Sequence, residues 1–201
     1  FKFQTFYSKW GFNMAILKIA RMGHPILMAR AQEVKDPSSP SVQQLVSDMV
    51  ETMLDAPGIG LAAPQVHVSS RIVVLQVPSE REGAEEGVPL NILINPEIEP
   101  MSERMEEGVE GCLSLPDMAG IVPRYTNIRY RAFDLEGQLM EAEAEGYHAR
   151  VLQHECDHLD GILYPMRMTD LSKLGYAEEM SKTARDLDSN KPVTDKEYVD
   201  V

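Results

Sequence analysis

The chain has 201 residues, 43% of them hydrophobic and 25% charged, which is the length and composition of a single globular domain. Its apolar runs are too short to span a membrane, no secretory signal pattern is visible, and the formal net charge of −13 argues against nucleic acid as a direct ligand, because phosphate binding needs a basic surface. The two cysteines, Cys112 and Cys156, are too few for a disulfide framework, so we expect reduced thiols in a reducing compartment. We also expect a monomer without a membrane partner.

The first residues differ from the rest of the chain. Residues 1–13 contain no acidic side chain and end just before Met14, where the sequence looks like a natural start. We interpret residues 1–13 as a cloning or upstream-frame remnant, with an organelle transit peptide as the alternative, and exclude them from the fold. The matching expectation for location is the bacterial cytoplasm, with an organellar matrix or stroma as the alternative.

The next segments predict a helix followed by two strands. Apolar residues recur at helical spacing over 42–54, which predicts an amphipathic helix of about 14 residues with Ser41 as its candidate N-cap. Residues 71–77 are apolar and β-branched, which is typical of a buried strand. An acidic loop over 79–87 then precedes a strand over 90–95 that we expect Pro96 to close.

The second half predicts a hairpin between strands and then helices. Alternating residues over 125–134 and 139–144 flank the turn at Glu136-Gly137, which indicates paired strands. A helix is predicted over about 146–159, ending near Gly161, and a last helix over 169–187 with Thr169 or Asp170 as cap, before a polar, disordered tail over 188–201. Antiparallel strands between helices predict an α+β domain.

The most specific local pattern is H-E-x-x-H at His154, Glu155 and His158, within the predicted helix 146–159. Positions i and i+4 lie on one helix face, so two imidazoles can hold one metal ion, and the adjacent carboxylate can act as general base on a metal-bound water. The alternative is a pair of core histidines beside a surface glutamate. We favour a metal site, because these polar groups would be costly to bury on an apolar helix without a partner.

Two further segments carry candidate functional groups. Cys112, in Glu110-Gly-Cys-Leu-Ser114, is either a buried apolar cysteine or a thiolate ligand that would complete a three-residue site with an open fourth position. Spacing alone does not decide between them. Residues 58–65 hold two glycines and two alanines, which suits either a tight packing turn or close approach of a substrate, and Gln65 could donate its amide N–H to an oxyanion.

Together the three segments resemble one family, the peptide deformylases, which are metalloenzymes that remove the N-terminal formyl group from nascent polypeptides. The family's signature motifs G-x-G-x-A-A-x-Q, E-G-C-x-S and H-E-x-x-H stand in this order at residues 58–65, 110–114 and 154–158. The resemblance covers about residues 14–168, which we take as the catalytic domain, with 169–201 as a C-terminal helix and polar tail. It implies antiparallel sheets packed around a central helix that carries H-E-x-x-H.

The resemblance also implies a role for each matched residue. Cys112, His154 and His158 are then metal ligands, Glu155 is the general base, and the side chain of Gln65 and the backbone N–H of Leu113 are oxyanion donors. Gly60 is a backbone contact to the substrate, and the remaining matched positions line the pocket for the methionine side chain: Ile59, Glu110, Tyr147, Arg150 and Val151. The implied metal is one divalent ion, Fe²⁺ in the cell, with Zn²⁺, Ni²⁺ or Co²⁺ as exchange products. Formyl-Met nascent peptides are the implied partners, with transient proximity to the ribosome.

The chain departs from the family pattern in four places. An arginine that holds the substrate backbone in many bacterial members is missing near Ala119, and Arg124 is either a partial substitute or part of a surface ion pair. Tyr147 and Arg150 replace aliphatic pocket residues, and we expect the Arg150 head to reach solvent. His67 stands where a glycine is frequent and is predicted to be a surface loop residue. Residues 166–201 hold more acidic than basic residues, which argues against docking on the ribosome through this segment.

Three other functions remain open. A general H-E-x-x-H metallopeptidase would cleave internal peptide bonds. A hydrolase with Cys112 as nucleophile and His154 as base would keep its activity in a chelator. A non-catalytic metal-binding module would retain metal after Glu155→Ala and show no turnover before or after that change.

Overall fold

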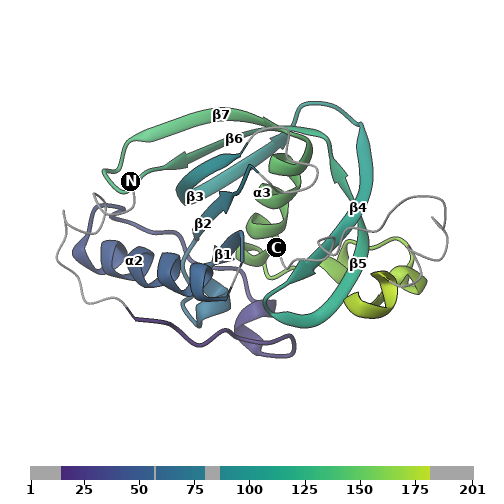
Figure 1. The fold of residues 1–201 in the computed structure, drawn as a ribbon. Helices are drawn as coiled ribbons and strands as arrows, with labels where there is room; N and C mark the ends of the chain where they lie inside the picture. The colour runs from purple at the N-terminus through teal and green to yellow at the C-terminus, as the bar shows by residue number, and fades with distance from the viewer. Residues whose placement is uncertain (1–14, 57, 80–86, 182–201) are drawn as a thin grey trace.

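The computed structural model describes residues 15–56, 58–79 and 87–181, with helix α3 between two antiparallel sheets (Figure 1). A five-stranded sheet has the order β1-β2-β3-β6-β7, and a three-stranded sheet has the order β4-β5-β8. The α+β class is thereby confirmed, and α3 contains His154, Glu155 and His158. The elements are η1 (Pro25–Met28), α2 (Pro40–Asp55), β1 (Gly60–Ala62), η2 (Ala63–Val66), β2 (Ile72–Val77), β3 (Val88–Pro100), β4 (Met105–Cys112), β5 (Leu115–Tyr125), β6 (Asn127–Phe133), β7 (Leu139–Glu145), α3 (Gly146–Leu159), η3 (Tyr164–Met166), η4 (Leu171–Lys173) and β8 (Leu174–Tyr176).

Helix α2 begins earlier than the sequence suggested. Ser39, not Ser41, is the N-cap, and its carbonyl accepts hydrogen bonds from Val42 and Gln43. Pro40 occupies the first helical position, where a fixed φ favours helix and the missing N–H costs nothing. The apolar face of α2 packs on one side of the five-stranded sheet, so this helix closes the core on the face opposite α3.

Strand β3 continues past Pro96, where we expected it to end. Its first half pairs with β2 and its second half with β6, and the register shifts between Ile94 and Glu97. Pro96 lies within that irregularity, where a missing N–H removes no regular ladder bond. Asn95 beside it has φ 51°, and its side chain accepts a hydrogen bond from Val34 N (2.9 Å) and donates one to Val34 O (2.9 Å).

Replacing Asn95 with alanine is expected to lower the free energy of unfolding by about 1–3 kcal/mol. The change removes both hydrogen bonds to Val34 and places a residue with a Cβ but no local hydrogen-bonding group in the left-handed region. Asn95→Gly loses the same bonds without the φ penalty. Urea denaturation of the two variants should therefore find Asn95→Ala the less stable. Equal stabilities would contradict a free-energy penalty for alanine in the left-handed backbone conformation of residue 95.

The hairpin β4–β5 was not predicted from sequence. Residues 105–112 are rich in glutamate and glycine, and β5 contains Pro116 and Pro123, so local propensity argues against strands. Pairing along the length of the hairpin, from Met105 with Tyr125 to Cys112 with Leu115, outweighs that propensity. The hairpin matters for function because it carries the E-G-C-x-S motif to α3.

The predicted hairpin over residues 125–144 is confirmed as β6–β7, although Tyr125 belongs to β5. Asp134 fixes its turn, since the carboxylate accepts hydrogen bonds from the N–H groups of Glu136 and Gln138, and Gly137 has φ 76°. The turn at Glu136-Gly137 was predicted from sequence, whereas the role of Asp134 was not.

The C-terminal helix does not begin at Thr169. Asp170 does cap a turn, but the turn is the short η4, and β8 then pairs with Met118–Gly120 of β5. The open edge of β5 offers these residues backbone partners that a helix would leave unused. Residues 177–181 are helical. The predicted features over 1–13, 182–187 and 188–201, and most of the loop 79–87, lie outside the described residues.

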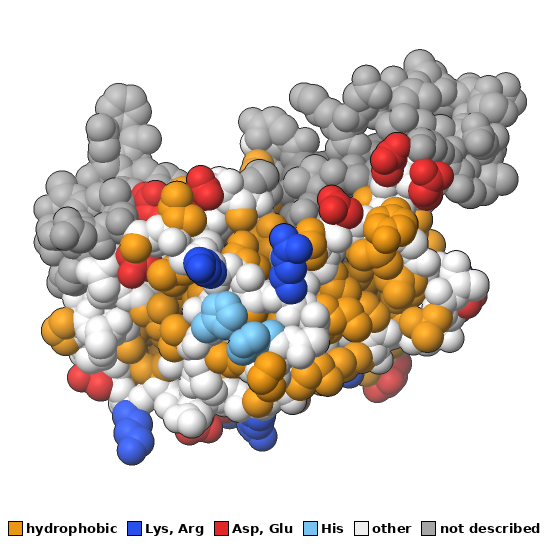
Figure 2. All heavy atoms as spheres, turned by 90° about the horizontal axis from the view of Figure 1, so that it is seen from below, with side chains coloured by type: hydrophobic (Ala, Val, Ile, Leu, Met, Phe, Trp, Pro, Cys, Tyr) orange, Lys and Arg blue, Asp and Glu red, His pale blue; other side chains and the backbone are white. Residues whose placement is uncertain are grey.

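Figure 2 shows the face seen from below, where hydrophobic side chains gather on both sides of exposed histidines. His24 and His67 are exposed and their ring centroids are 4.7 Å apart. His67 is therefore at the surface, as expected. Within the described ranges, no helix has both the length and the apolarity that a membrane crossing requires.

Candidate metal centre and active site

Helix α3 brings polar side chains into the middle of the molecule. Every residue from Ala149 to Leu159 is buried, although five of the positions 153–158 are polar or charged. His154 and His158 lie one turn apart on one face, with ring centroids 5.0 Å apart and the ring planes at 81°. Burial of so many polar groups on one helix is costly unless each has a partner.

Cys112 joins the two histidines from the opposite side. It ends β4, at a register shift just before the two-residue turn Leu113-Ser114, so its side chain faces α3. The sulfur lies 3.3 Å from His158 Nε2, and the candidate ligand atoms of the three residues all lie within 4.8 Å of one another. Donors that share one tetrahedral ion through bonds of 2.0–2.3 Å are about 3.4–3.7 Å apart, so the three atoms are near this spacing and small side-chain rotations would bring all of them onto one metal ion.

The pattern of unpaired buried atoms also fits a metal. His154 Nδ1 is engaged by Glu110 Oε2 at 2.8 Å, whereas His154 Nε2 is buried without a hydrogen-bond partner. Both carboxylate oxygens of Glu155 are likewise buried and unpartnered. Such atoms are rare in folded proteins unless an ion or water completes them. Two imidazoles and one thiolate suit Zn²⁺ or Fe²⁺ rather than Mg²⁺ or Ca²⁺.

Glu155 packs directly against β1. A Cβ added to Gly60 would lie only 2.2 Å from Glu155 Oε1. The Glu155 carboxylate can therefore occupy its observed position only because residue 60 has no side chain. Burial raises the pKa of Glu155 to about 7. This raised pKa belongs to the site without an ion, and the charge of a bound divalent cation would lower it again. The geometry places a buried carboxylate beside the candidate ligands, where a general base is needed.

Gly60→Ala is therefore expected to lower the catalytic rate about 100-fold, because the added methyl group displaces the Glu155 carboxylate by an ångström or more. Gly175→Ala is the matched control, because it lies in β8, which carries no candidate site residue, and a Cβ there would meet the movable Met180 side chain at 3.3 Å. The rates of hydrolysis and the metal content of both variants check this. A Gly60→Ala enzyme as fast as Gly175→Ala would contradict the steric role of Gly60.

Gln65 is held with its amide group beside the cysteine. Its Oε1 accepts a hydrogen bond from Ala62 N (2.8 Å), so Nε2 faces Ser114 Oγ (3.3 Å) and Cys112 Sγ (3.6 Å). Leu113 follows Cys112 in the same turn. Sequence reasoning gave Ser114 no role, although its place in the E-G-C-x-S motif was the available signal. In the structure Ser114 helps to orient Gln65.

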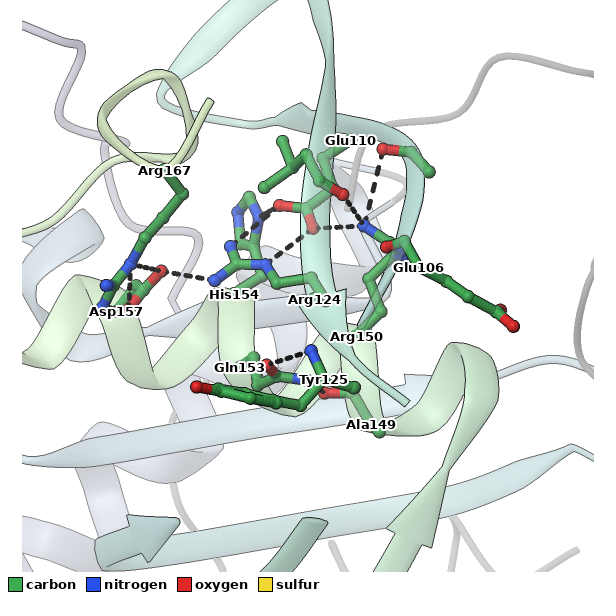
Figure 3. A network of polar contacts seen from close by, with 12 residues as sticks. Glu106, Glu110, Arg124, Tyr125, Ala149, Arg150, Gln153, His154, Asp157 and Arg167 are labelled. Atoms are coloured by element: carbon green, nitrogen blue, oxygen red, sulfur yellow. Dashed lines mark hydrogen bonds and ion pairs between the residues drawn. The ribbon is translucent and has the colours of Figure 1, made fainter. Parts of the chain in front are cut away.

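The residues expected to line the methionine pocket divide into two groups. Ile59 and Val151 are buried in one apolar cluster, and the half-buried Tyr147 packs against the same cluster. Glu110 and Arg150 instead belong to a buried ionic network (Figure 3). The expectation that the Arg150 head reaches solvent is wrong, because its guanidinium donates to Glu110 and to backbone carbonyls of both β4 and β5.

Glu110 is the centre of that network. Its carboxylate accepts two hydrogen bonds from Arg124 (2.9 and 3.0 Å) and pairs with His154. Burial alone would raise the pKa of Glu110, but the hydrogen bonds with His154 and Arg124 outweigh it and hold the pKa well below its usual value. An ionised Glu110 accepts the His154 Nδ1 proton, which leaves Nε2 free as a ligand.

One of the two hypotheses for Arg124, that it belongs to a surface ion pair, is wrong. Its side chain is 5% exposed and bridges Glu110 to Asp157 of α3 (2.6 Å), which also pairs with Arg167. It therefore points toward the helix, and no contact places it as a substitute for the missing substrate-binding arginine. Neither Arg124 nor Asp157 was identified from sequence as a partner of the site, since their pairing depends on contacts 14 to 33 residues apart.

Comparison with known proteins gives consistent matches over most of the chain. A family model described as polypeptide deformylase matches residues 16–174. Peptide deformylase 1 of Bordetella pertussis is 51% identical over 161 residues, which are 80% of this chain and 92% of the relative, and peptide deformylase 1 of Nitrosomonas europaea is 48% identical over 166 residues, 82% of this chain and 94% of the relative.

Solved structures of the same kind have a similar fold. The class I type b peptide deformylase from Acinetobacter baumannii with bound Met-Ala-Ser is 36% identical, with a TM-score of 0.73, and the match covers 78% of this chain and 100% of that chain. Peptide deformylase from Ehrlichia chaffeensis is 32% identical, with a TM-score of 0.72, covering 88% and 99%.

Proposed function

This chain belongs to the peptide deformylase family, and we propose that Cys112, His154 and His158 hold the metal ion with which it removes the N-formyl group from nascent polypeptides. The observation that carries the proposal is the meeting of three buried ligand atoms within 4.8 Å beside the buried, unpartnered carboxylate of Glu155. The ion we propose for the cell is Fe²⁺, with Zn²⁺, Ni²⁺ or Co²⁺ able to replace it.

The residues around the site have separable tasks. When bound, a divalent ion supplies Lewis acidity that makes water a nucleophile near neutral pH. Glu155 takes a proton from the attacking water and returns it to the leaving amine. Gln65 Nε2 and the Leu113 N–H stabilise the negative charge that develops on the formyl oxygen. Loss of one such donor typically costs about 10²–10³ in rate.

We further propose that the substrate is a formyl-Met peptide whose methionine side chain contacts Ile59, Tyr147 and Val151. These residues share an apolar cluster next to the helix that carries the ligands. A related enzyme has been solved with bound Met-Ala-Ser, a peptide with methionine at its N-terminus. An unbranched apolar side chain such as methionine can fill an irregular apolar space of this kind.

The place of action follows from the substrate. Nascent formyl peptides exist where translation occurs, so we propose that this chain works near ribosomes in the bacterial cytoplasm, as a monomer. Residues 166–201 carry six basic and eight acidic residues, so electrostatic docking on RNA is not part of the proposal. Light scattering of the purified protein tests the monomeric state.

The deciding experiment is an anaerobic assay of formate release from a formyl-Met tripeptide by protein loaded with Fe²⁺. We expect formate and no cleavage of internal peptide bonds, loss of activity in a chelator, and its return with added Fe²⁺ or Co²⁺. Activity that survives complete metal removal would favour a cysteine nucleophile. Cleavage of unformylated peptides would favour a general peptidase. Metal-loaded protein that releases no formate would overturn the proposed function.

A further inference from the structure

Arg150 is a bridge between α3 and both strands of the hairpin β4–β5. Its Nη1 donates to Glu110 Oε1 (3.0 Å) and to the carbonyl of Val122 (2.8 Å), and its Nη2 donates to the carbonyl of Glu106 (2.7 Å) (Figure 3). Its Nη1 also lies 3.4 Å from the carbonyl of Gly108. One planar guanidinium thus binds a carboxylate and three carbonyls, a fixed fork of donors that no other side chain offers.

Gly108 makes this approach possible. A Cβ at position 108 would lie 2.7 Å from Arg150 Cζ and 2.7 Å from Nη2, so the guanidinium occupies the space that a side chain would need. The φ of Gly108 is not in the left-handed region, so the backbone does not require glycine there. The glycine is explained by the contact with Arg150.

The bridge connects the two parts of the candidate metal site. Arg150 lies one helical turn before His154 on α3, while Gly108 and Glu110 are alternate residues of β4, the strand that ends at Cys112. Arg150 therefore contacts the strand two and four residues before the thiolate, and contacts it from the helix that carries both imidazoles. Arg150 also contributes one of the positive charges in the buried ionic network. Arg124 and Arg150 carry two positive charges, which offset the two negative charges of the buried Glu110 and Asp157.

We propose that Arg150 is a positioning residue for the metal centre: with Gly108, it fixes β4 against α3 and so sets Cys112 and Glu110 relative to His154. The proposal rests on the proposed function for the identity of the ligands. It assigns to Arg150 a task different from lining the methionine pocket, since its guanidinium makes all its polar contacts within the described ranges with β4 or β5.

The test compares Co²⁺-loaded wild type with Arg150→Met, Arg150→Lys and Gly108→Ala. Arg150→Met keeps the length of the stem and removes every donor, Arg150→Lys keeps the charge without the fork, and Gly108→Ala displaces the guanidinium without removing a polar group. Arg129→Met is the matched control, because Arg129 is an exposed arginine of β6 whose partners are Glu141 and Glu143. The readouts are the visible absorption bands of the thiolate-ligated Co²⁺, the rate of Co²⁺ loss to a chelator, and kcat and KM separately.

For Arg150→Met we expect shifted Co²⁺ bands, Co²⁺ loss about 10–100-fold faster than in Arg129→Met, and kcat lower by a similar factor, with KM changed less than threefold. Arg150→Lys should recover part of this loss. Because both single changes act on one contact, the double variant Gly108→Ala/Arg150→Met should be little worse than Arg150→Met alone.

Unchanged Co²⁺ bands and wild-type kcat in Arg150→Met would overturn the proposal, even if that variant melts at a lower temperature, because a purely structural arginine predicts that result. A rise in KM alone would also overturn the proposal, because that result would indicate that Arg150 contributes to substrate binding in the methionine pocket. If Arg150→Met does not fold, Gly108→Ala decides by the same bands: a wild-type spectrum contradicts the proposal. Failure of the proposed function would be seen separately, as absence of formate release by wild type while the Co²⁺ comparison still gives its answer.

Discussion

Replacing Glu155 with glutamine is expected to lower the rate of formate release about 10²–10⁴-fold while the metal stays bound. The side chain is fully buried, and neither carboxylate oxygen has a partner among the described residues. Glutamine keeps the shape and the fit against Gly60 but cannot accept and return a proton. Metal analysis and single-turnover formate release measure the two parts of this expectation.

The same substitution is expected to raise the free energy of unfolding although it lowers the activity. A buried carboxylate without a protein partner destabilises the fold, so Glu155→Gln should unfold at an equal or higher urea concentration in the metal-free state, by on the order of 1 kcal/mol. Glu143→Gln, an exposed carboxylate of β7 paired with Arg129, is the matched control and should change neither activity nor stability appreciably. A Glu155→Gln protein that retains wild-type activity would remove Glu155 from the mechanism.

Cys112→Ser is expected to weaken metal binding by more than 100-fold. Changing a residue that only orients a ligand typically costs about 10–100-fold, and Cys112 is itself a proposed ligand whose thiolate a neutral hydroxyl does not replace. Activity at a limiting metal concentration should fall with occupancy. Competition with a chromophoric chelator measures the affinity.

Cys156→Ser is the matched control, since it makes the same atomic change at the other buried cysteine. Burial raises the pKa of the Cys156 thiol well above its usual value, so this group stays protonated and packs as a small apolar side chain. We expect metal affinity within twofold of wild type for Cys156→Ser. A Cys112→Ser protein that holds metal as wild type does, yet releases no formate, would instead support the nucleophile hypothesis.

The sequence could predict those parts of the site and fold that depend on residues close to one another in the chain. The spacing of His154 and His158 fixes one helix face, and α3 has the predicted bounds, Gly146–Leu159. The hairpin β6–β7 was equally local, because its turn residues and alternation lie within 20 residues. Bringing Cys112 next to the histidines required the family resemblance, since no short-range rule relates positions 42 residues apart.

The parts that sequence could not predict depend on long-range pairing. Strands β4 and β5 have glutamates, glycines and prolines where isolated strands favour β-branched residues, and only their mutual pairing and their packing on α3 make them strands. Arg150 was expected to reach solvent with its head, because a long arginine can lay its stem along an apolar pocket and keep its charge in water. In the structure its guanidinium donates to the Glu110 carboxylate and to the carbonyls of Glu106, Gly108 and Val122. Contacts to backbone carbonyls do not depend on residue type, so no sequence pattern could predict them.

The burial of α3 links the abundance of this protein to the supply of metal. The three donors come together only in the folded chain, so an ion that binds them stabilises that state by about 4 kcal/mol at a concentration 1,000 times its dissociation constant. The buried amides of α3 can exchange with solvent or reach a protease only through the largest opening reactions of the domain. Cells starved of metal would therefore lose the enzyme itself by turnover of its opened form, in addition to losing the activity of each molecule.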